Sequence, residues 1–325
     1  MITMFQKFSE YQKQLFQLYS EQRYSEALRI AEEAGRSFPT RAGRTIYWRA
    51  CLLCRLGKPD EALRVLQEGL RDGHWWGISK LSADADLAPL QGRPDFQEIV
   101  AECERRRQAA QAQAKPHLKV LEPVGGSTVK TPVLLALHWA AGNVEDFADY
   151  WQAAWQQGWL IALPQSSQIC SEDGFWWPDY ELGRREVLAT FERFRQEYVF
   201  CADEIVIAGA SQGGVLAVRL ALEGAIPCRG FLAVVPSLRD HTVEELIPLL
   251  KAAAERGLGG WIITGERDPC LEPTRRFHEQ ALKHGLRCEL FVKPGMGHAF
   301  PVDFDTDLLQ ALAFFKSITS DHEHR

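Results

Sequence analysis

The sequence predicts an α/β protein: a doubly wound, mostly parallel sheet, preceded by an all-α domain of helical repeats. Three observations support this prediction. The first hundred or so residues have helical periodicity and contain a repeated motif. Later apolar runs have the near-continuous character of strands that are buried on both faces. Amphipathic segments separate these runs, and alternating β and α units of this kind form parallel sheets.

The N-terminal part contains an internal repeat. The segments YSEALRIAEEAGRSFP, from Tyr24, and PDEALRVLQEGLRDG, from Pro59, share the core Glu-Ala-Leu-Arg at an offset of 35 residues. The small side chains of Ala27 and Ala62 suit positions where two helices cross closely. The pattern resembles tetratricopeptide repeats, whose period is about 34 residues. We therefore assign residues 1–112 to a tetratricopeptide-like helical domain, with a divergent third unit around DADLAPLQGRPDFQEIVAECERR.

Residues 113–325 form the predicted sheet domain. Its strand-like runs are PVLLALHW, GWLIALPQ, EIVIAGAS, GFLAVVPS, GWIITGER and CELFVKPG. The amphipathic segments between and after them are 144–157, 181–198, 212–223, 242–256, 274–284 and 305–319. In such a sheet the functional loops lie at the carboxyl ends of the strands. Polar residues that follow these runs are therefore the candidates for a functional site.

The stretch IVIAGASQGG places one hydroxyl, that of Ser211, at a tight corner between a strand and a helix. A GxSxG motif in this context is a nucleophile elbow, in which a strained turn lifts the serine above the sheet. Gly209 and Gly213 leave room for strand and helix to approach each other. The backbone N–H of Gln212 opens the following helix, where the helix dipole favours an anion. The motif predicts that Ser211 is a nucleophile.

Two further strand ends hold the partners that a serine nucleophile needs. Asp268 lies just beyond the run GWIITGER, and His298 lies in the loop PGMGHAFP after the last strand. The chain order Ser–Asp–His, each after a successive strand, favours His298 as general base. Asp268 would then accept from its imidazole and fix the tautomer. Glu266 is the competing acid, and the spacing from the strand end favours Asp268.

The segment from Pro116 to Ser320 resembles the α/β-hydrolase superfamily. Within it, the segment is similar to predicted esterases related to phospholipase/carboxylesterases and acyl-protein thioesterases. The elbow IVIAGASQGG and the histidine loop PGMGHAFP account for most of the likeness. Hydrolases of this type have an HGxG-like oxyanion loop where this chain has His138-Trp139-Ala140. The resemblance implies that the amides of Ala140 and Gln212 form an oxyanion hole, although Trp139 stands where glycine is usual.

The resemblance implies a serine carboxylesterase that cleaves a small-molecule ester, with short to medium acyl chains, through an acyl-enzyme intermediate. This chemistry requires no metal and no organic cofactor. Trp139, Trp176 and Trp177 are candidates for an apolar substrate pocket, with ordinary packing over the sheet edge as the alternative for the loop tryptophans. His138 is expected to have a structural role beneath the oxyanion loop.

Composition excludes other classes of function. The formal net charge of −6 argues against a nucleic-acid partner, which would need a basic surface. No apolar run is long enough to cross a membrane. Eight cysteines without framework spacing, and an N-terminus unlike a secretory signal, indicate a reducing, cytoplasmic location. Because a short repeat array buries its faces only against neighbours, we expect a homodimer through the helical domain.

Two other classes of function stay open at this point. One is a peptidase or acyl-transferase of the same fold. The other is a catalytically inert protein whose repeat array binds a partner. The intact order of Ser211, Asp268 and His298 argues against the inert alternative, whereas ester and peptide substrates would separate the enzymatic ones.

Overall fold

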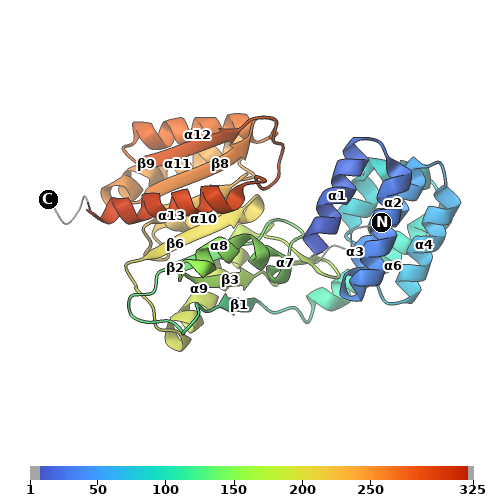
Figure 1. Ribbon diagram of the computed structural model, residues 1–325, viewed down its shortest axis with the longest axis horizontal. Coiled ribbons are helices and arrows are strands. Elements are labelled where there is room, and N and C mark those ends of the chain that lie inside the picture. The colour runs from blue at the N-terminus through green and yellow to red at the C-terminus, as the bar shows by residue number, and fades with distance from the viewer. Residues whose placement is uncertain (1–7, 321–325) are drawn as a thin grey trace. The chain divides into compact units, whose positions relative to one another are not determined.

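The computed structural model describes residues 8–320 (Figure 1). The chain divides into two compact units. The helical unit consists of residues 1–113 together with residues 169–172, and the sheet unit consists of residues 114–168 and 173–325. The short segment 169–172, which the sequence analysis placed in the sheet domain, therefore packs with the helices.

The helical unit consists of packed helices, in which successive members of the first four α-helices contact each other. Its elements are α1 (Phe8–Ser20), α2 (Tyr24–Ser37), η1 (Pro39–Arg41), α3 (Ala42–Arg55), α4 (Pro59–Arg71), α5 (Ile78–Ala83), η2 (Ala85–Leu90) and α6 (Pro94–Gln111). The repeated motif lies in α2 and α4, where Ala27 and Ala62 are fully buried. Gly57 takes a positive φ of 74° in the turn between α3 and α4, a conformation that glycine adopts without a steric cost.

Residues 169–172 are held by groups of the helical unit. The N–H of Ile169, at the start of β4 (Ile169–Ser171), donates to the side-chain oxygen of Gln111 at 2.9 Å. The carboxylate of Glu172 lies 2.9 Å from Nδ1 of His74. A Cβ on Gly77 would stand 2.9 Å from the carbonyl of Cys170, so the close approach requires glycine there. These contacts explain why the segment groups with the helices.

The sheet unit is built on seven strands in the order β1-β3-β2-β6-β7-β8-β9. They are β1 (His117–Leu121), β2 (Val133–Leu137), β3 (Leu160–Gln165), β6 (Ile205–Ala210), β7 (Gly230–Val234), β8 (Gly259–Gly265) and β9 (Arg287–Lys293); β5 (Gly174–Phe175) lies outside this sheet. Only β1 is antiparallel within it. The prediction of a mostly parallel, doubly wound sheet is confirmed.

Helices cover both faces of the sheet, which explains the continuous apolar runs. One core cluster joins the sheet to α9 (Tyr180–Glu197), α10 (Gln212–Glu223), α11 (Asp240–Glu255) and α12 (Leu271–Lys283). The other cluster joins it to α7 (Val144–Ala148), η3 (Asp149–Trp151), α8 (Gln152–Gln156) and α13 (Phe304–Ser320). Five of the six predicted amphipathic segments correspond to single helices, with ends displaced by at most four residues.

The amphipathic segment 144–157 is helical as expected, but a 3₁₀ turn, η3, divides it into α7 and α8. Two large aromatic side chains of this segment enter the same core. Phe147 and Trp151 are both fully buried, with ring centroids 5.3 Å apart. The two residues are four positions apart, so they lie on one face of the helical segment.

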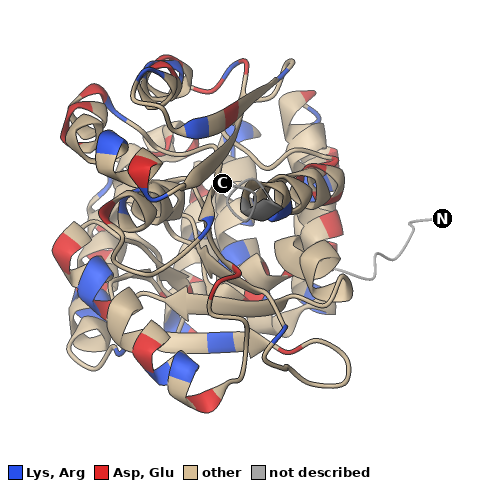
Figure 2. Ribbon diagram, turned by 90° about the vertical axis from the view of Figure 1, so that its left-hand side faces the viewer, with Lys and Arg blue, Asp and Glu red and all other residues tan. Residues whose placement is uncertain are grey.

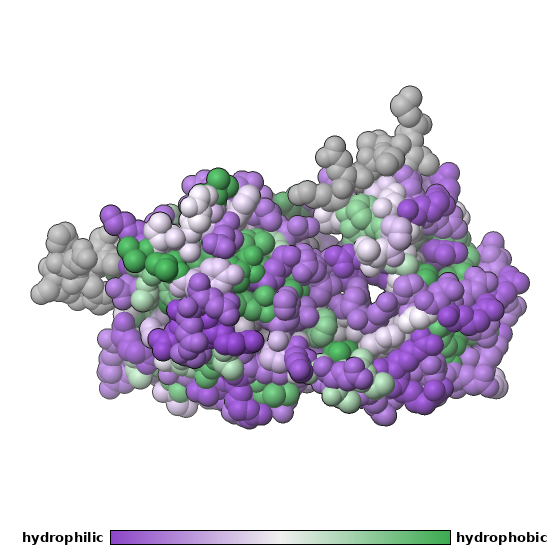
Figure 3. Space-filling view, turned by 90° about the horizontal axis from the view of Figure 1, so that it is seen from below, coloured by the Kyte–Doolittle hydropathy of each residue, from purple (hydrophilic) through white to green (hydrophobic). Residues whose placement is uncertain are grey.

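Charges of both signs are mixed in the view of Figure 2. Figure 2 shows acidic and basic residues intermixed over the helices, while the strands consist mainly of uncharged residues. Apolar areas are interrupted by polar ones on the face in Figure 3. The large apolar side chains that are exposed come from separate places in the sequence, such as Phe16, Val124, Val199 and Leu282. None of the described helices is both long and apolar enough to cross a membrane.

Candidate active site

Ser211 lies at a strained corner between β6 and α10. Its backbone has φ 54° and ψ −117°, a region that residues with a Cβ rarely adopt. The neighbouring glycines are required by close backbone contacts. A Cβ on Gly213 would stand 2.3 Å from the carbonyls of Leu137 and His138, and one on Gly209 would stand 2.3 Å from the carbonyl of Gly213. The corner thus packs directly against the carboxyl end of β2.

The structure brings Ser211, His298 and Asp268 together in one chain of hydrogen bonds. Nε2 of His298 is 2.8 Å from Oγ of Ser211. Nδ1 of His298 is 2.9 Å and 3.0 Å from the two carboxylate oxygens of Asp268. Since the carboxylate accepts, Nδ1 carries the imidazole hydrogen and Nε2 is left to accept from the serine hydroxyl. The carboxylate side chain is fully buried, whereas 31% of the imidazole side chain is exposed.

Asp268 is held as a carboxylate. Burial alone would raise its pKa, but three hydrogen bonds outweigh burial and lower the pKa below its ordinary value. The donors are the ring of His298, the N–H of Cys270 and the hydroxyl of Thr264, which lie 2.8–3.1 Å from the carboxylate oxygens. Asp268 therefore remains charged well into the acidic range and fixes the tautomer of His298.

Glu266 has a different place in the same region. Its carboxylate accepts from the N–H of Gly295 at 2.8 Å, and its own N–H donates to the carbonyl of Lys293. The N–H of Arg267 donates to the carbonyl of Met296. These bonds join the loop after β8 to the loop that leads to His298. Asp268, and not Glu266, is the acid within hydrogen-bonding distance of His298.

The loop after β2 is shaped by His138, which is fully buried. Its Nδ1 donates to the carbonyl of Trp139 at 2.8 Å, and its Nε2 accepts from the N–H of Ser166 at 3.3 Å. Burial lowers the pKa of His138 to about 4, so the imidazole is neutral. In a trans peptide the C=O and the next N–H point in opposite directions. The bond to Trp139 thus turns the N–H of Ala140 away from His138.

Gln212 opens α10, and its N–H belongs to the first turn, where backbone donors have no partner within the helix. Its side-chain oxygen accepts from the N–H of Trp177 at 2.7 Å. This bond engages the side chain of Gln212 with Trp177. The backbone N–H of Gln212 stands at the N-terminus of α10. Ala140 is exposed and precedes Ala141, whose φ of 60° turns the chain back towards Gly142.

The three candidate pocket tryptophans have different surroundings. Trp177 is 5% exposed, lies in the core and donates from its indole N–H to the carbonyl of His138 at 2.9 Å. These contacts favour the packing alternative for Trp177. Trp139 is half-buried and packs edge-on against Phe147 and Tyr150. Trp176 is half-buried too, and its N–H donates to the carbonyl of Gln168.

The sequence analysis missed Ser237, whose hydroxyl oxygen is 2.8 Å from Oγ of Ser211. It follows β7, the strand next to β6 in the sheet. The available signal was its position, because the run GFLAVVPS ends in a hydroxyl at the same edge of the sheet as the elbow.

Comparison with known proteins finds a family that matches the N-terminal part of the chain and solved structures that are similar to it. Residues 7–111 match the family described as A/B hydrolase-like, N-terminal domain. A crystal structure of an uncharacterized protein from Bacillus cereus ATCC 10987 is 26% identical, and the match covers 96% of this chain and 99% of that one with a TM-score of 0.55. The chain has the α/β-hydrolase fold. No curated protein matches the sequence.

Two further solved structures share this fold with a part of the chain. Esterase PE8 is 16% identical with a TM-score of 0.51, and the match covers 63% of this chain and 99% of that one. Est1E from Butyrivibrio proteoclasticus, solved with ferulic acid, is 15% identical with a TM-score of 0.50, and the match covers 64% and 96%. At this identity the likeness establishes the fold.

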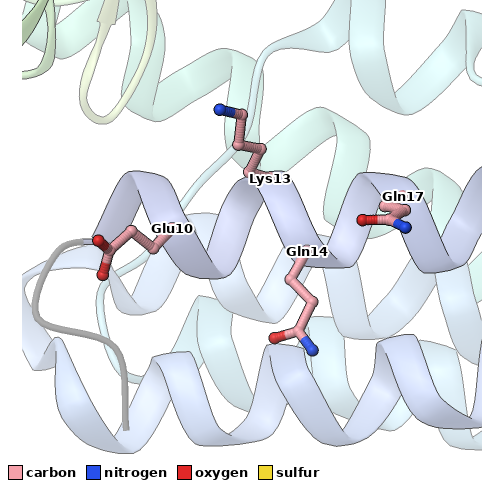
Figure 4. A pocket seen from close by; sticks show the side chains of 4 residues that line it. All are labelled: Glu10, Lys13, Gln14 and Gln17. Atoms are coloured by element: carbon pink, nitrogen blue, oxygen red, sulfur yellow. The ribbon is translucent and has the colours of Figure 1, made fainter. Parts of the chain in front are cut away.

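A pocket on α1 of the helical unit has no comparable chemistry. Figure 4 shows the side chains that line it, Glu10, Lys13, Gln14 and Gln17. All four belong to one helix, and none pairs a nucleophile with a base. The α/β-hydrolase unit therefore holds the candidate active site, in the loops after β2, β6, β7, β8 and β9.

Proposed function

We propose that the protein is a serine hydrolase that cleaves carboxylic esters. The observation that supports this most strongly is the continuous chain of hydrogen bonds from Asp268 through His298 to Ser211. A buried carboxylate, a half-exposed imidazole and a hydroxyl on a strained corner are the groups that nucleophilic acyl transfer needs. The α/β-hydrolase fold places them on loops at one edge of the sheet.

In the proposed acylation step, Nε2 of His298 takes the hydroxyl proton of Ser211 while Oγ bonds to the carbonyl carbon of the ester. The amides of Ala140 and Gln212 hold the oxyanion, and the carboxylate of Asp268 stabilises the imidazolium. The bond to the leaving oxygen then breaks, and His298 protonates the departing alcohol. Water repeats the sequence, releasing the acid and returning the proton to Ser211.

We propose esters with short to medium acyl chains as substrates. One structure of the same fold is described as an esterase, PE8, and another, Est1E, was solved with ferulic acid bound. The half-buried Trp139 lies one residue before the proposed oxyanion donor Ala140, so its indole is the candidate to contact the acyl group. Trp176 is the second candidate, and it lies in the loop between β5 and α9.

The test is hydrolysis of a p-nitrophenyl ester series by the wild type and Ser211→Ala. We expect the alanine variant to lose on the order of 10⁶-fold in kcat, with an unchanged melting temperature because a single partly exposed hydroxyl is removed. Ser317→Ala, which removes an exposed hydroxyl from α13, is the matched control and should retain full turnover. Equal turnover by wild type and Ser211→Ala would refute the proposal, and faster cleavage of a peptide p-nitroanilide would reassign the substrate class.

We also propose that the protein works in a reducing compartment such as the cytoplasm. No disulfide joins any of the eight cysteines, all of which lie in the part of the chain that the structure describes, and six of them are buried. Burial raises the pKa of the Cys54 thiol to about 11 and that of Cys228 to about 12, so these thiols stay protonated and unreactive at neutral pH. Free cysteines in this number are typical of proteins kept reduced.

A further inference from the structure

Ser237 contacts the proposed nucleophile at two points. Its hydroxyl oxygen is 2.8 Å from Oγ of Ser211, and its backbone N–H donates to the carbonyl of Ser211 at 3.1 Å. The N–H of Ser211 in turn donates to the carbonyl of Val234, at the end of β7. The turn after β7 is thus fastened to the corner after β6 through both backbone and side chain.

The backbone that presents Ser237 is strained. Val235 is buried and has a φ of 39°, although a β-branched residue is disfavoured at positive φ. Its N–H donates to the carbonyl of Ile263 at 2.7 Å, which holds it in place. Such strain persists only where surrounding contacts impose it, and it is concentrated at functional sites. Here it directs the chain from β7 over Ser211.

Gly214, the residue after the elbow, lies against this turn. A Cβ on Gly214 would lie 3.2 Å from the carbonyl oxygen of Gly209 and 3.4 Å from Cα and Cβ of Pro236. Gly214 lies outside the GxSxG pentapeptide, whose own spacing does not require it. The N–H of Leu238 donates to the carbonyl of Pro236 at 2.7 Å and closes the turn. The elbow sequence therefore accommodates both the nucleophile and the turn that presents Ser237.

The hydrogen-bond directions follow from the tautomer of His298. Nδ1 of His298 carries the hydrogen that Asp268 accepts, so Nε2 can only accept, and Ser211 donates its own hydrogen there. Between the two serines, the hydrogen must then come from Ser237. Oγ of Ser211 consequently donates to His298 and accepts from Ser237 in the same resting arrangement.

We propose that Ser237 is a fourth catalytic residue, whose hydroxyl donates a hydrogen bond to Oγ of Ser211 throughout the reaction; this rests on the proposed esterase function. The bond holds Oγ in line with Nε2 of His298. It also stabilises the negative charge that grows on Oγ as its proton moves to His298, and again when the bond from Oγ to the acyl carbon breaks during deacylation. Ser237 keeps its own proton, and the transferred proton travels only between Ser211, His298, the alcohol and water.

The test compares Ser237→Ala with the wild type on p-nitrophenyl acetate, following the pre-steady-state release of p-nitrophenol and the steady state separately. We expect both the acylation rate and kcat to fall about 10- to 100-fold in Ser237→Ala, because a hydrogen bond to a developing charge is lost. KM should change less than about threefold, since ground-state binding is retained. A purely structural serine would shift the melting temperature and leave these rates unchanged.

Three comparisons make the outcome decisive. Ser237→Thr, which keeps a hydroxyl, should recover most of the rate. Ser237→Cys, whose thiol is a weak donor of similar size, should resemble the alanine variant and replaces it should that variant fail to fold. Ser317→Ala is the control for loss of a remote hydroxyl. An active wild type with equally fast Ser237→Ala or Ser237→Cys would overturn the role of Ser237 alone, whereas an inactive, folded wild type would overturn the proposed function with it.

Discussion

Two clusters of reactive side chains, one in each unit, differ in whether a base is hydrogen-bonded to the nucleophile. In the sheet unit, Ser211 faces the accepting nitrogen of His298, which is 31% exposed. In the helical unit, Cys51 lies beside Asp84 and Asp86, with one ligand-type atom of each within 4.8 Å of the others. Asp84 already accepts from the hydroxyl of Tyr47 at 2.7 Å. Proximity of reactive groups is common to both clusters.

The difference lies in activation. Burial, followed by the neighbouring charge of Asp84, raises the pKa of the Cys51 thiol far above neutral pH, so no thiolate forms. No imidazole hydrogen-bonds to it among the described residues. Ser211, by contrast, has an oriented base, a strained backbone and a helix N-terminus beside it. The comparison teaches that nucleophilic chemistry requires an oriented base hydrogen-bonded to the nucleophile, whereas a buried cluster without such a base contributes to stability.

The largest effect that would sharpen this comparison is that of the acid. Asp268→Asn should reduce kcat/KM for a p-nitrophenyl ester by about 10⁴-fold, because an amide favours the wrong tautomer of His298. Glu266→Gln is the matched control in the same loop region, where the carboxylate contacts a backbone N–H of the histidine loop. We expect less than about a tenfold loss for it, since no charge in the chain to Ser211 changes. Equal losses in the two variants would contradict the assignment of Asp268.

An intermediate effect, on the pH dependence of stability, concerns a buried histidine of the sheet unit. His138 has a pKa of about 4 in the folded protein, against about 6.5 when unfolded. The unfolded chain therefore binds a proton first, and stability falls as pH drops from about 6.5 towards 4, by up to about 3 kcal/mol. Above pH 6.5 this contribution is fully present. Urea unfolding across this pH range measures it.

His138→Gln provides the comparison for that titration. The variant should be less stable at pH 7, because a buried hydrogen-bonding ring is replaced, and its stability should fall less steeply between pH 6.5 and 4. An unchanged slope would show that other groups cause the loss of stability in acid. An imidazole resonance that is assigned to His138, by its loss in His138→Gln, and that titrates near pH 6.5 in the folded protein would contradict the buried, neutral state of His138.

The smallest effect is expected in the helical unit. Tyr47→Phe removes the hydroxyl that donates to Asp84, and should cost about 1–3 kcal/mol of stability because it leaves a half-buried carboxylate short of a donor. Turnover of esters should stay within about twofold of the wild type, since the hydroxyl takes no part in the reaction. Thermal unfolding and steady-state kinetics on the same preparation test both. A tenfold loss of kcat at unchanged stability would break the proposed distinction between the clusters.

Most of the fold and the central site could be predicted from sequence because the determinants are local. The strand runs are apolar on both faces, and Gly209, Ser211 and Gly213 lie within one pentapeptide whose spacing encodes the corner. Asp268 and His298 follow successive strands, and parallel topology brings such positions to one edge. The tetratricopeptide-like character of the helical unit stays a prediction, while its similarity is to the N-terminal domain family of A/B hydrolase-like proteins.

The features that sequence could not reveal depend on distant contacts. Nothing in the letters of 169–172 indicates that Ile169 would bond to Gln111, because the two are far apart in the chain. The apolar pattern of 144–157 does not show that a 3₁₀ turn divides it into α7 and α8. The contact of Ser237 with Ser211 requires a positive φ at Val235, a residue type for which no sequence rule predicts it.

The most direct test of the account is reaction of the folded wild type with a fluorophosphonate, followed by mass spectrometry of the labelled peptide. The account predicts a single adduct on Ser211 and its loss in His298→Gln, because the hydroxyl is reactive only with the imidazole to take its proton. An adduct confined to another side chain, such as Ser237 or Cys51, or equal labelling of Ser211 in wild type and His298→Gln, would contradict it.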